Sequence, residues 1–173
     1  MMKKYLFLFF IICFTLSLCA CSKDAPDPLG YQSYPFFVEG SLTCDEAIYD
    51  FSLSMEACDR SSITFSKPDS LRDFVFRVTP EGTTLSYEDM TIDFNKAEKT
   101  SLIRLIPSLF ALKNEELVSS SEDMISSVPV LISCYNTSLG QLKVYLNKNT
   151  MTPLRFEGED FAVDVLSFSP APS

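Results

Sequence analysis

Histidine and tryptophan are both absent from this 173-residue sequence, and glycine occurs only five times. Without histidine, the chain cannot build Ser-His-Asp or Cys-His catalysis, histidine metal ligands or a histidine pH switch. Basic residues are also scarce, because 14 Lys and Arg stand against 23 Asp and Glu, a formal net charge of -9. Phosphate groups are bound by clustered Lys and Arg, so we expect no nucleic acid among the partners.

Motifs for enzyme chemistry are missing as well. The sequence has no G-x-S-x-G, no glycine-rich phosphate loop and no H-E-x-x-H motif. Adjacent acidic residues, such as Glu88 and Asp89, lie beside predicted turns, where carboxylates are usually solvated. Three cysteines beyond residue 21 match no metal-ligand spacing, and their odd number leaves the pairing open: Cys44, Cys58 and Cys134. We therefore expect a non-enzymatic protein with no metal and no cofactor.

The first twenty residues have the pattern of an export signal. Lys3 and Lys4 precede a nearly unbroken apolar run from Tyr5 to Leu18. As a helix this run would span roughly 21 Å, which is short of the roughly 30 Å of a membrane core. A basic start, a short apolar segment and small residues predict a secretory signal peptide over residues 1–20. Its removal would take two lysines and no acid, leaving 153 residues with a net charge of -11.

The end of this segment, Leu18-Cys19-Ala20-Cys21, resembles the bacterial lipobox. The resemblance implies that Cys21 is diacylated, is the first mature residue and anchors the protein on the extracytoplasmic side of the bacterial cell membrane. Two acyl chains give stable attachment, at about 0.8 kcal/mol for each buried CH₂. An uncleaved anchor with incidental cysteines is the alternative interpretation. Because a body this acidic would not bind an anionic membrane by charge, attachment is expected through Cys21.

Strand-like alternation dominates the rest of the chain. Residues 21–35 are rich in proline and polar residues and predict a lipidated tether, and residues 169–173 predict a frayed tail. Between them, residues 36–168 predict a single domain. Apolar and polar residues alternate with period two, which indicates strands, over residues 36–43, 49–56, 62–66, 73–78, 85–87, 90–94, 128–134, 142–146, 154–156 and 161–165. The short turns between them predict an antiparallel meander.

A helical pattern interrupts the strands. Apolar residues recur at three- and four-residue steps over residues 102–112, and Pro107 within them predicts a kink or two short helices. Residues 114–127 are polar, and we expect a second short helix around residues 121–125. The fold class is therefore α+β, with helical cover on one face of the sheet.

Phenylalanine is the informative surplus, with 15 in the sequence and 11 after residue 20. Their alternation fits two structures that periodicity cannot separate. One is an ordinary filled core, and the other is a slot for a lipid chain between sheet and helix. In the second case the candidate ligand-binding residues are Phe51, Leu53, Phe65, Phe74, Phe76, Leu105, Leu109, Phe110 and Phe156.

The order of elements and one local run also resemble a known family. The run is Leu142–Asn147 followed by Thr150–Phe156, which predicts a strand, a turn with a Thr-x-x-Pro-like element and another strand. Over residues 36–166 the chain is similar to the LolA/LolB-like lipoprotein-localisation carriers. The resemblance implies a strongly bent antiparallel sheet, an unclosed barrel, with helices covering the concave face and an acyl-binding cavity between. The leading helix of that family has no counterpart in residues 22–35.

Two functions follow as expectations. The first is a membrane-anchored, non-enzymatic lipoprotein that binds or carries a lipid or another apolar ligand in a cavity between sheet and helix. The alternative is an envelope interaction module with a filled core, which contacts another surface protein through sheet edges or an acidic face.

Overall fold

The computed structural model describes residues 27–94 and 101–171, which form one antiparallel sheet of eleven strands. The predicted signal peptide and Cys21 lie outside these residues. Before the helix come β1 Phe36–Cys44, β2 Ala47–Ala57, β3 Arg60–Phe65, β4 Val75–Val78, β5 Thr83–Tyr87 and β6 Met90–Phe94. After it come β7 Leu117–Ile125, β8 Val128–Thr137, β9 Gly140–Asn147, β10 Pro153–Glu157 and β11 Phe161–Pro170. The helix is α2 Leu102–Leu109, and three 3₁₀ turns are η1 Gly30–Ser33, η2 Asp69–Leu71 and η3 Asn114–Glu116.

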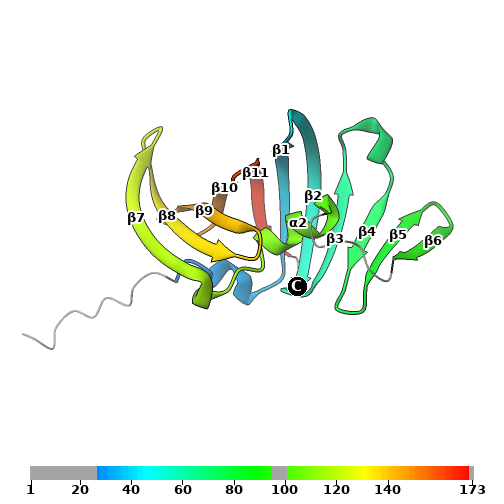
Figure 1. Ribbon diagram of the computed structural model, residues 1–173, viewed down its shortest axis with the longest axis horizontal. Coiled ribbons are helices and arrows are strands. Elements are labelled where there is room, and N and C mark those ends of the chain that lie inside the picture. Colours follow the sequence, from blue (N-terminus) through cyan, green and yellow to red (C-terminus); the bar gives the residue numbers. More distant parts are fainter. Residues whose placement is uncertain (1–26, 95–100, 172–173) are drawn as a thin grey trace, which may run out of the picture.

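The sheet consists of two antiparallel meanders, β1–β6 and β7–β11. The first strand, β1, pairs with the last strand, β11, and so joins the two meanders into one sheet. The strand order is β6-β5-β4-β3-β2-β1-β11-β10-β9-β8-β7, so β1 and β11 are neighbours. They pair from Phe36↔Pro170 to Cys44↔Phe161, with a register shift between Glu39 and Gly40. The sheet curves strongly and stays unclosed, with β6 and β7 as its two edges (Figure 1). The predicted antiparallel meander is confirmed.

Strand β7 corrects the prediction for residues 114–127. A second short helix was expected around residues 121–125, but β7 pairs there with β8 from Leu117↔Tyr135 to Ile125↔Val128. Nearly every β7 side chain is exposed, so no alternation marks this strand in the sequence. Its position is set by the backbone ladder and by a 3.1 Å hydrogen bond between the Ser120 and Ser133 hydroxyls. Five strands therefore follow the helix.

Helix α2 is single and short. A kink or two helices were expected at Pro107, but the helix ends two residues after it, and the Phe110 amide donates to the Pro107 carbonyl at 3.1 Å. The proline lies in the last turn of a single helix, so the expected division into two helices does not occur. Among the described residues this is the one α-helix, so cover by several helices is not confirmed.

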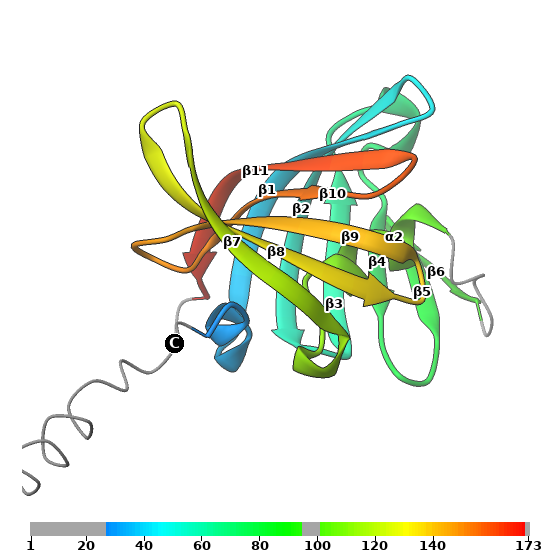
Figure 2. The same cartoon turned by 60° about the vertical axis from the view of Figure 1, so that its left-hand side comes forward.

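Helix α2 lies within the curve of the sheet (Figures 1 and 2). Its buried apolar side chains, Leu105, Ile106 and Leu109, belong to the same core cluster as the sheet. The Nε group of the half-buried Arg104 donates to the buried Thr83 hydroxyl of β5 at 3.3 Å. No helix among the described residues has both the length and the apolar character needed to cross a membrane.

The packed domain begins before β1. Residues 21–35 were expected to form a tether, but Leu29 and Tyr31 are 7% and 2% exposed and belong to the core. The Tyr31 ring makes edge contacts, at centroid distances of 5.9 Å each, with Phe36 and Phe168. Two apolar residues among polar ones produce no period, which is why the sequence did not reveal this packing. At the other end β11 reaches Pro170, so it extends into the expected frayed tail.

Candidate functional site

The side chains expected to line a cavity belong to one hydrophobic core cluster. Eight of them are at most 7% exposed, and the ninth, Phe74, is half-buried against the same cluster. The Phe110 ring at the end of α2 lies 4.7 Å from Phe156 and 6.0 Å from Phe36, measured between centroids. These rings pack against one another between helix and sheet. The eight are Phe51, Leu53, Phe65, Phe76, Leu105, Leu109, Phe110 and Phe156.

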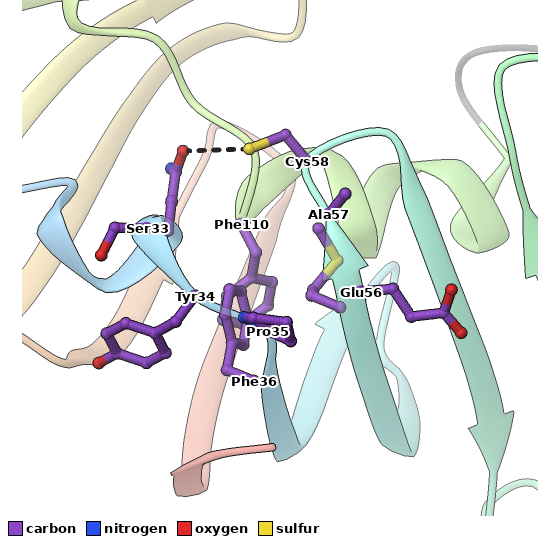
Figure 3. A pocket seen from close by; sticks show the side chains of 10 residues that line it. Ser33, Tyr34, Pro35, Phe36, Glu56, Ala57, Cys58 and Phe110 are labelled. Atoms are coloured by element: carbon purple, nitrogen blue, oxygen red, sulfur yellow. Dashed lines mark hydrogen bonds between the residues drawn. The ribbon is translucent and has the colours of Figure 1, made fainter. Parts of the chain in front are cut away.

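One of these residues, Phe110, also lines a pocket that opens to the surface (Figure 3). We name it the Phe110 pocket, and its volume is about 240 Å³. Residues from the end of η1 to the start of β1 form one wall, and the end of β2 with Cys58 forms the other. The lining residues are Gln32, Ser33, Tyr34, Pro35, Phe36, Met55, Glu56, Ala57, Cys58 and Phe110.

The Phe110 pocket has an apolar floor and a polar rim. Phe36, Met55 and Phe110 are each at most 3% exposed and form the floor. At the rim, the Cys58 thiol donates to the Gln32 side-chain oxygen at 3.9 Å, drawn as a dashed line in Figure 3. A short apolar group can enter such a pocket while a polar end stays in water, since a dry cavity of about 150 Å³ already holds benzene.

A buried tyrosine, Tyr31, is hydrogen-bonded to the rim residue Gln32. The Gln32 side-chain amide donates to the Tyr31 hydroxyl at 3.4 Å. Burial raises the pKa of Tyr31 well above its ordinary value, so this hydroxyl stays neutral. The rim thus connects η1 to the β2–β3 turn through Cys58, Gln32 and Tyr31, and Glu56 is the one charged residue in the pocket lining. Sequence reasoning missed these residues because they lie in the expected tether and in a turn.

Two other cavities have different linings. One, of about 290 Å³, lies beside α2 and shares Cys58 with the Phe110 pocket, so the β2–β3 turn separates the two. The largest, of about 670 Å³, lies among β7 to β10 and carries Lys143, Glu157 and Glu159. Its lining mixes both charge signs and contains no aromatic side chain other than Tyr135. Neither of these two cavities is lined by any of the residues predicted to bind a ligand.

The described residues hold no group suited to metal binding. Nowhere in residues 27–94 and 101–171 do three His, Cys, Asp or Glu side chains gather in a metal-binding arrangement. The three cysteines whose pairing was left open are free thiols: Cys44, Cys58 and Cys134. What the site can do with the residues described is bind an apolar group.

A second apolar feature lies at the β6 edge. The register places Phe76 beside Leu85, and Leu85 beside Ile92, so one apolar row runs from the core to the edge strand. Exposure rises along it from 6% at Phe76 to 52% at Ile92. Met90 and Phe94 flank Ile92 and are 60% and 42% exposed. Contiguous exposed apolar side chains of this kind mark binding surfaces.

Comparison with known proteins finds relatives by fold only. No protein-family model and no curated protein matches the chain. An uncharacterised conserved protein from Thermus thermophilus is 13% identical, over 82% of this chain and 81% of that one, with a TM-score of 0.57. A structure of MucB is 10% identical, over 84% of this chain and 57% of that one, with a TM-score of 0.50.

A LolA superfamily protein from Nitrosomonas europaea is also matched, at 8% identity over 84% of this chain and 93% of that one, with a TM-score of 0.46. At such identities the likeness concerns the fold and not the residues of a site. The chain therefore shares its curved antiparallel-sheet fold with the Thermus thermophilus protein and with part of MucB.

Proposed function

We propose that this chain is a non-enzymatic, membrane-anchored lipoprotein that binds the apolar part of a lipid or a similar ligand at the Phe110 pocket. The observation that carries the proposal is that Phe110 belongs both to the pocket lining and to the core. Its ring lines the surface pocket and also packs on Phe156, inside the curve of the sheet. The pocket is therefore continuous with the aromatic core that the sequence predicted as the ligand site.

Binding would follow from the layout of the pocket. An apolar chain end enters between η1 and the end of β2, and its polar end remains at the rim beside Gln32 and Cys58. A longer chain displaces the Phe110 ring from its place between helix and sheet. Each CH₂ moved from water into this space contributes about 0.8 kcal/mol.

Filling the pocket tests this function. Ala57 is exposed on the wall at the end of β2, and Ala57→Phe would occupy the space with a ring. We expect the affinity for a fluorescent fatty acid to fall at least about tenfold, since excluding two CH₂ groups forfeits about 1.6 kcal/mol. The measurement is a fluorescence titration of the full chain. Ala47→Phe, at the other end of β2, is the matched control and should bind as the unmodified protein does. Equal affinity of all three proteins would refute the site.

Anchoring through Cys21 is a separate part of the proposal. We expect less of the Cys21→Ala protein in the membrane fraction, because the lipid attachment site is gone. The remainder should be soluble or should be an uncleaved precursor of larger size. Cys58→Ala is the control, since this exposed thiol has no part in the lipobox resemblance. Immunoblots of fractionated cells provide the measurement. Unchanged partitioning of Cys21→Ala would show that attachment does not depend on this cysteine.

An envelope interaction module is the second candidate function. The exposed apolar side chains of β6 favour it, since they extend the face of the sheet beyond the helix. MucB, which shares the fold, has been crystallised in complex with MucA. Failure of the fatty-acid titration together with saturable protein binding at β6 would favour this function over ligand binding.

A further inference from the structure

The two edges of the sheet differ in how they are protected against pairing. Unprotected edge strands pair with other strands, and natural edges carry charges, proline or bulges against this. The β7 edge has a register shift between Leu117 and Ser119 and adjacent acids at Glu122 and Asp123. The β6 edge pairs with β5 over all five residues without a shift, and its one charged side chain is Asp93, with no Lys, Arg or Pro. Among the described residues, β6 is therefore the less protected edge.

We propose that β6 pairs with β6 of a second copy of this chain, antiparallel and centred on Ile92. In this register Ile92 lies opposite the partner's Ile92, and Met90 lies opposite the partner's Phe94. The apolar row that ends half-exposed at Ile92 then continues across the interface into the partner. Cross-strand pairs of this kind each stabilise a sheet by about 0.2–1 kcal/mol. A two-fold axis uses the same strand in both copies and so forms a closed dimer.

Charge selects this register. In the register centred on Ile92, the Asp93 carboxylate lies opposite the partner's Thr91, whose hydroxyl can donate a hydrogen bond to it. Moving the axis to Asp93, or pairing the strands in parallel, sets two Asp93 carboxylates against each other. Moving it to Thr91 sets Asp93 against the partner's Asp89. Like charges directly opposite destabilise a strand pair, so these alternatives are disfavoured.

Cysteine cross-linking tests the register directly. Residues directly opposite in an antiparallel pair have Cα atoms about 4.5–5.5 Å apart, which suits a disulfide. In the full chain, with the exposed Cys58 changed to Ser, we expect Ile92→Cys to form a reducible homodimer under mild oxidation, at a yield several times that of its controls. Two differently tagged copies identify the homodimer. Ile92 is 52% exposed, so the substitution leaves the core intact.

The controls separate this pairing from its rivals. Thr91→Cys and Ser121→Cys, the second on the β7 edge, should give only background, because neither residue faces its own copy. As a second test, Met90→Cys copies mixed with Phe94→Cys copies should cross-link, while Met90→Cys alone should not. An Ile92→Cys yield no higher than that of Ser121→Cys would overturn the proposal. So would an Ile92→Cys adduct with a host protein only, or a cross-link between Ile92→Cys and Ser121→Cys copies.

Discussion

Replacing Phe110 by alanine is expected to lower the free energy of unfolding by about 3–5 kcal/mol. The ring is fully buried and contacts Phe36 and Phe156 from the end of α2. Its loss leaves a cavity between helix and sheet, because the flanking strands are held by their ladders and cannot close on it. Most of the cost comes from lost burial together with this cavity.

Chemical denaturation of the full chain measures the effect. Phe37→Ala is the control, since Phe37 is next to Phe36 on β1 but is 37% exposed on the opposite face. We expect it to lower the free energy of unfolding by about 1 kcal/mol or less. If Phe110→Ala costs no more than Phe37→Ala, the Phe110 ring is not part of the core.

Phe110→Ala also tests the proposed function. Removing the ring joins the Phe110 pocket to the space beside Phe156. Long-chain fatty acids should then gain affinity relative to short-chain ones, because only a long chain reaches the new cavity. A uniform loss for both lengths would mean that Phe110 is part of the wall of the pocket and does not gate a deeper site.

Gly40→Ala is expected to lower the free energy of unfolding by about 1–3 kcal/mol through overpacking. A Cβ at Gly40 would lie 2.7 Å from Cζ of Phe51 and 2.9 Å from the backbone oxygen of Asp164. The ring of Phe51 can rotate by a small amount, but the oxygen of Asp164 belongs to the β1–β11 pairing. Relief of the clash therefore requires the two central strands of the sheet to separate.

Gly30→Ala is the matched control for this substitution. A Cβ at Gly30 would have its nearest neighbour, an Asp27 carboxylate oxygen, at 3.8 Å, which is ordinary contact. We expect its free energy of unfolding to stay within about 0.5 kcal/mol of the unmodified protein. Urea denaturation curves of both variants make the comparison, and equal midpoints would contradict the steric role of Gly40.

Most strands could be predicted because one face of each is buried. In β1, Phe36, Val38 and Leu42 are buried and alternate with polar or exposed residues. The prediction failed at β7, where no face is buried, so that only backbone pairing to β8 holds the strand. It failed again at Leu29 and Tyr31, which reach the core from a segment without periodicity. Alternation depends on an apolar face and not on its burial, since it also predicted β6, whose five residues are all exposed.

The candidate site was likewise predictable only in part. The sequence placed Phe110 and Phe156 on apolar faces, and both are in the core. It could not show that the facing rings touch, because the distance between a helix and a sheet depends on how far the whole sheet curves. Nor could it show Gln32 and Cys58 at one rim, 26 residues apart in the chain.

What the sequence determined by itself is the strand periodicity, the antiparallel meander with its helical insertion and the acidic charge, while the export signal stays a prediction. Each of these depends on residues close together in the chain, where period and composition act directly. Only the tertiary structure decided which side chains share one core cluster, that a pocket opens above Phe110 and that β6 is an edge strand. These depend on which strands become neighbours and which are last, and the β1–β11 pairing that sets this order joins residues more than a hundred positions apart.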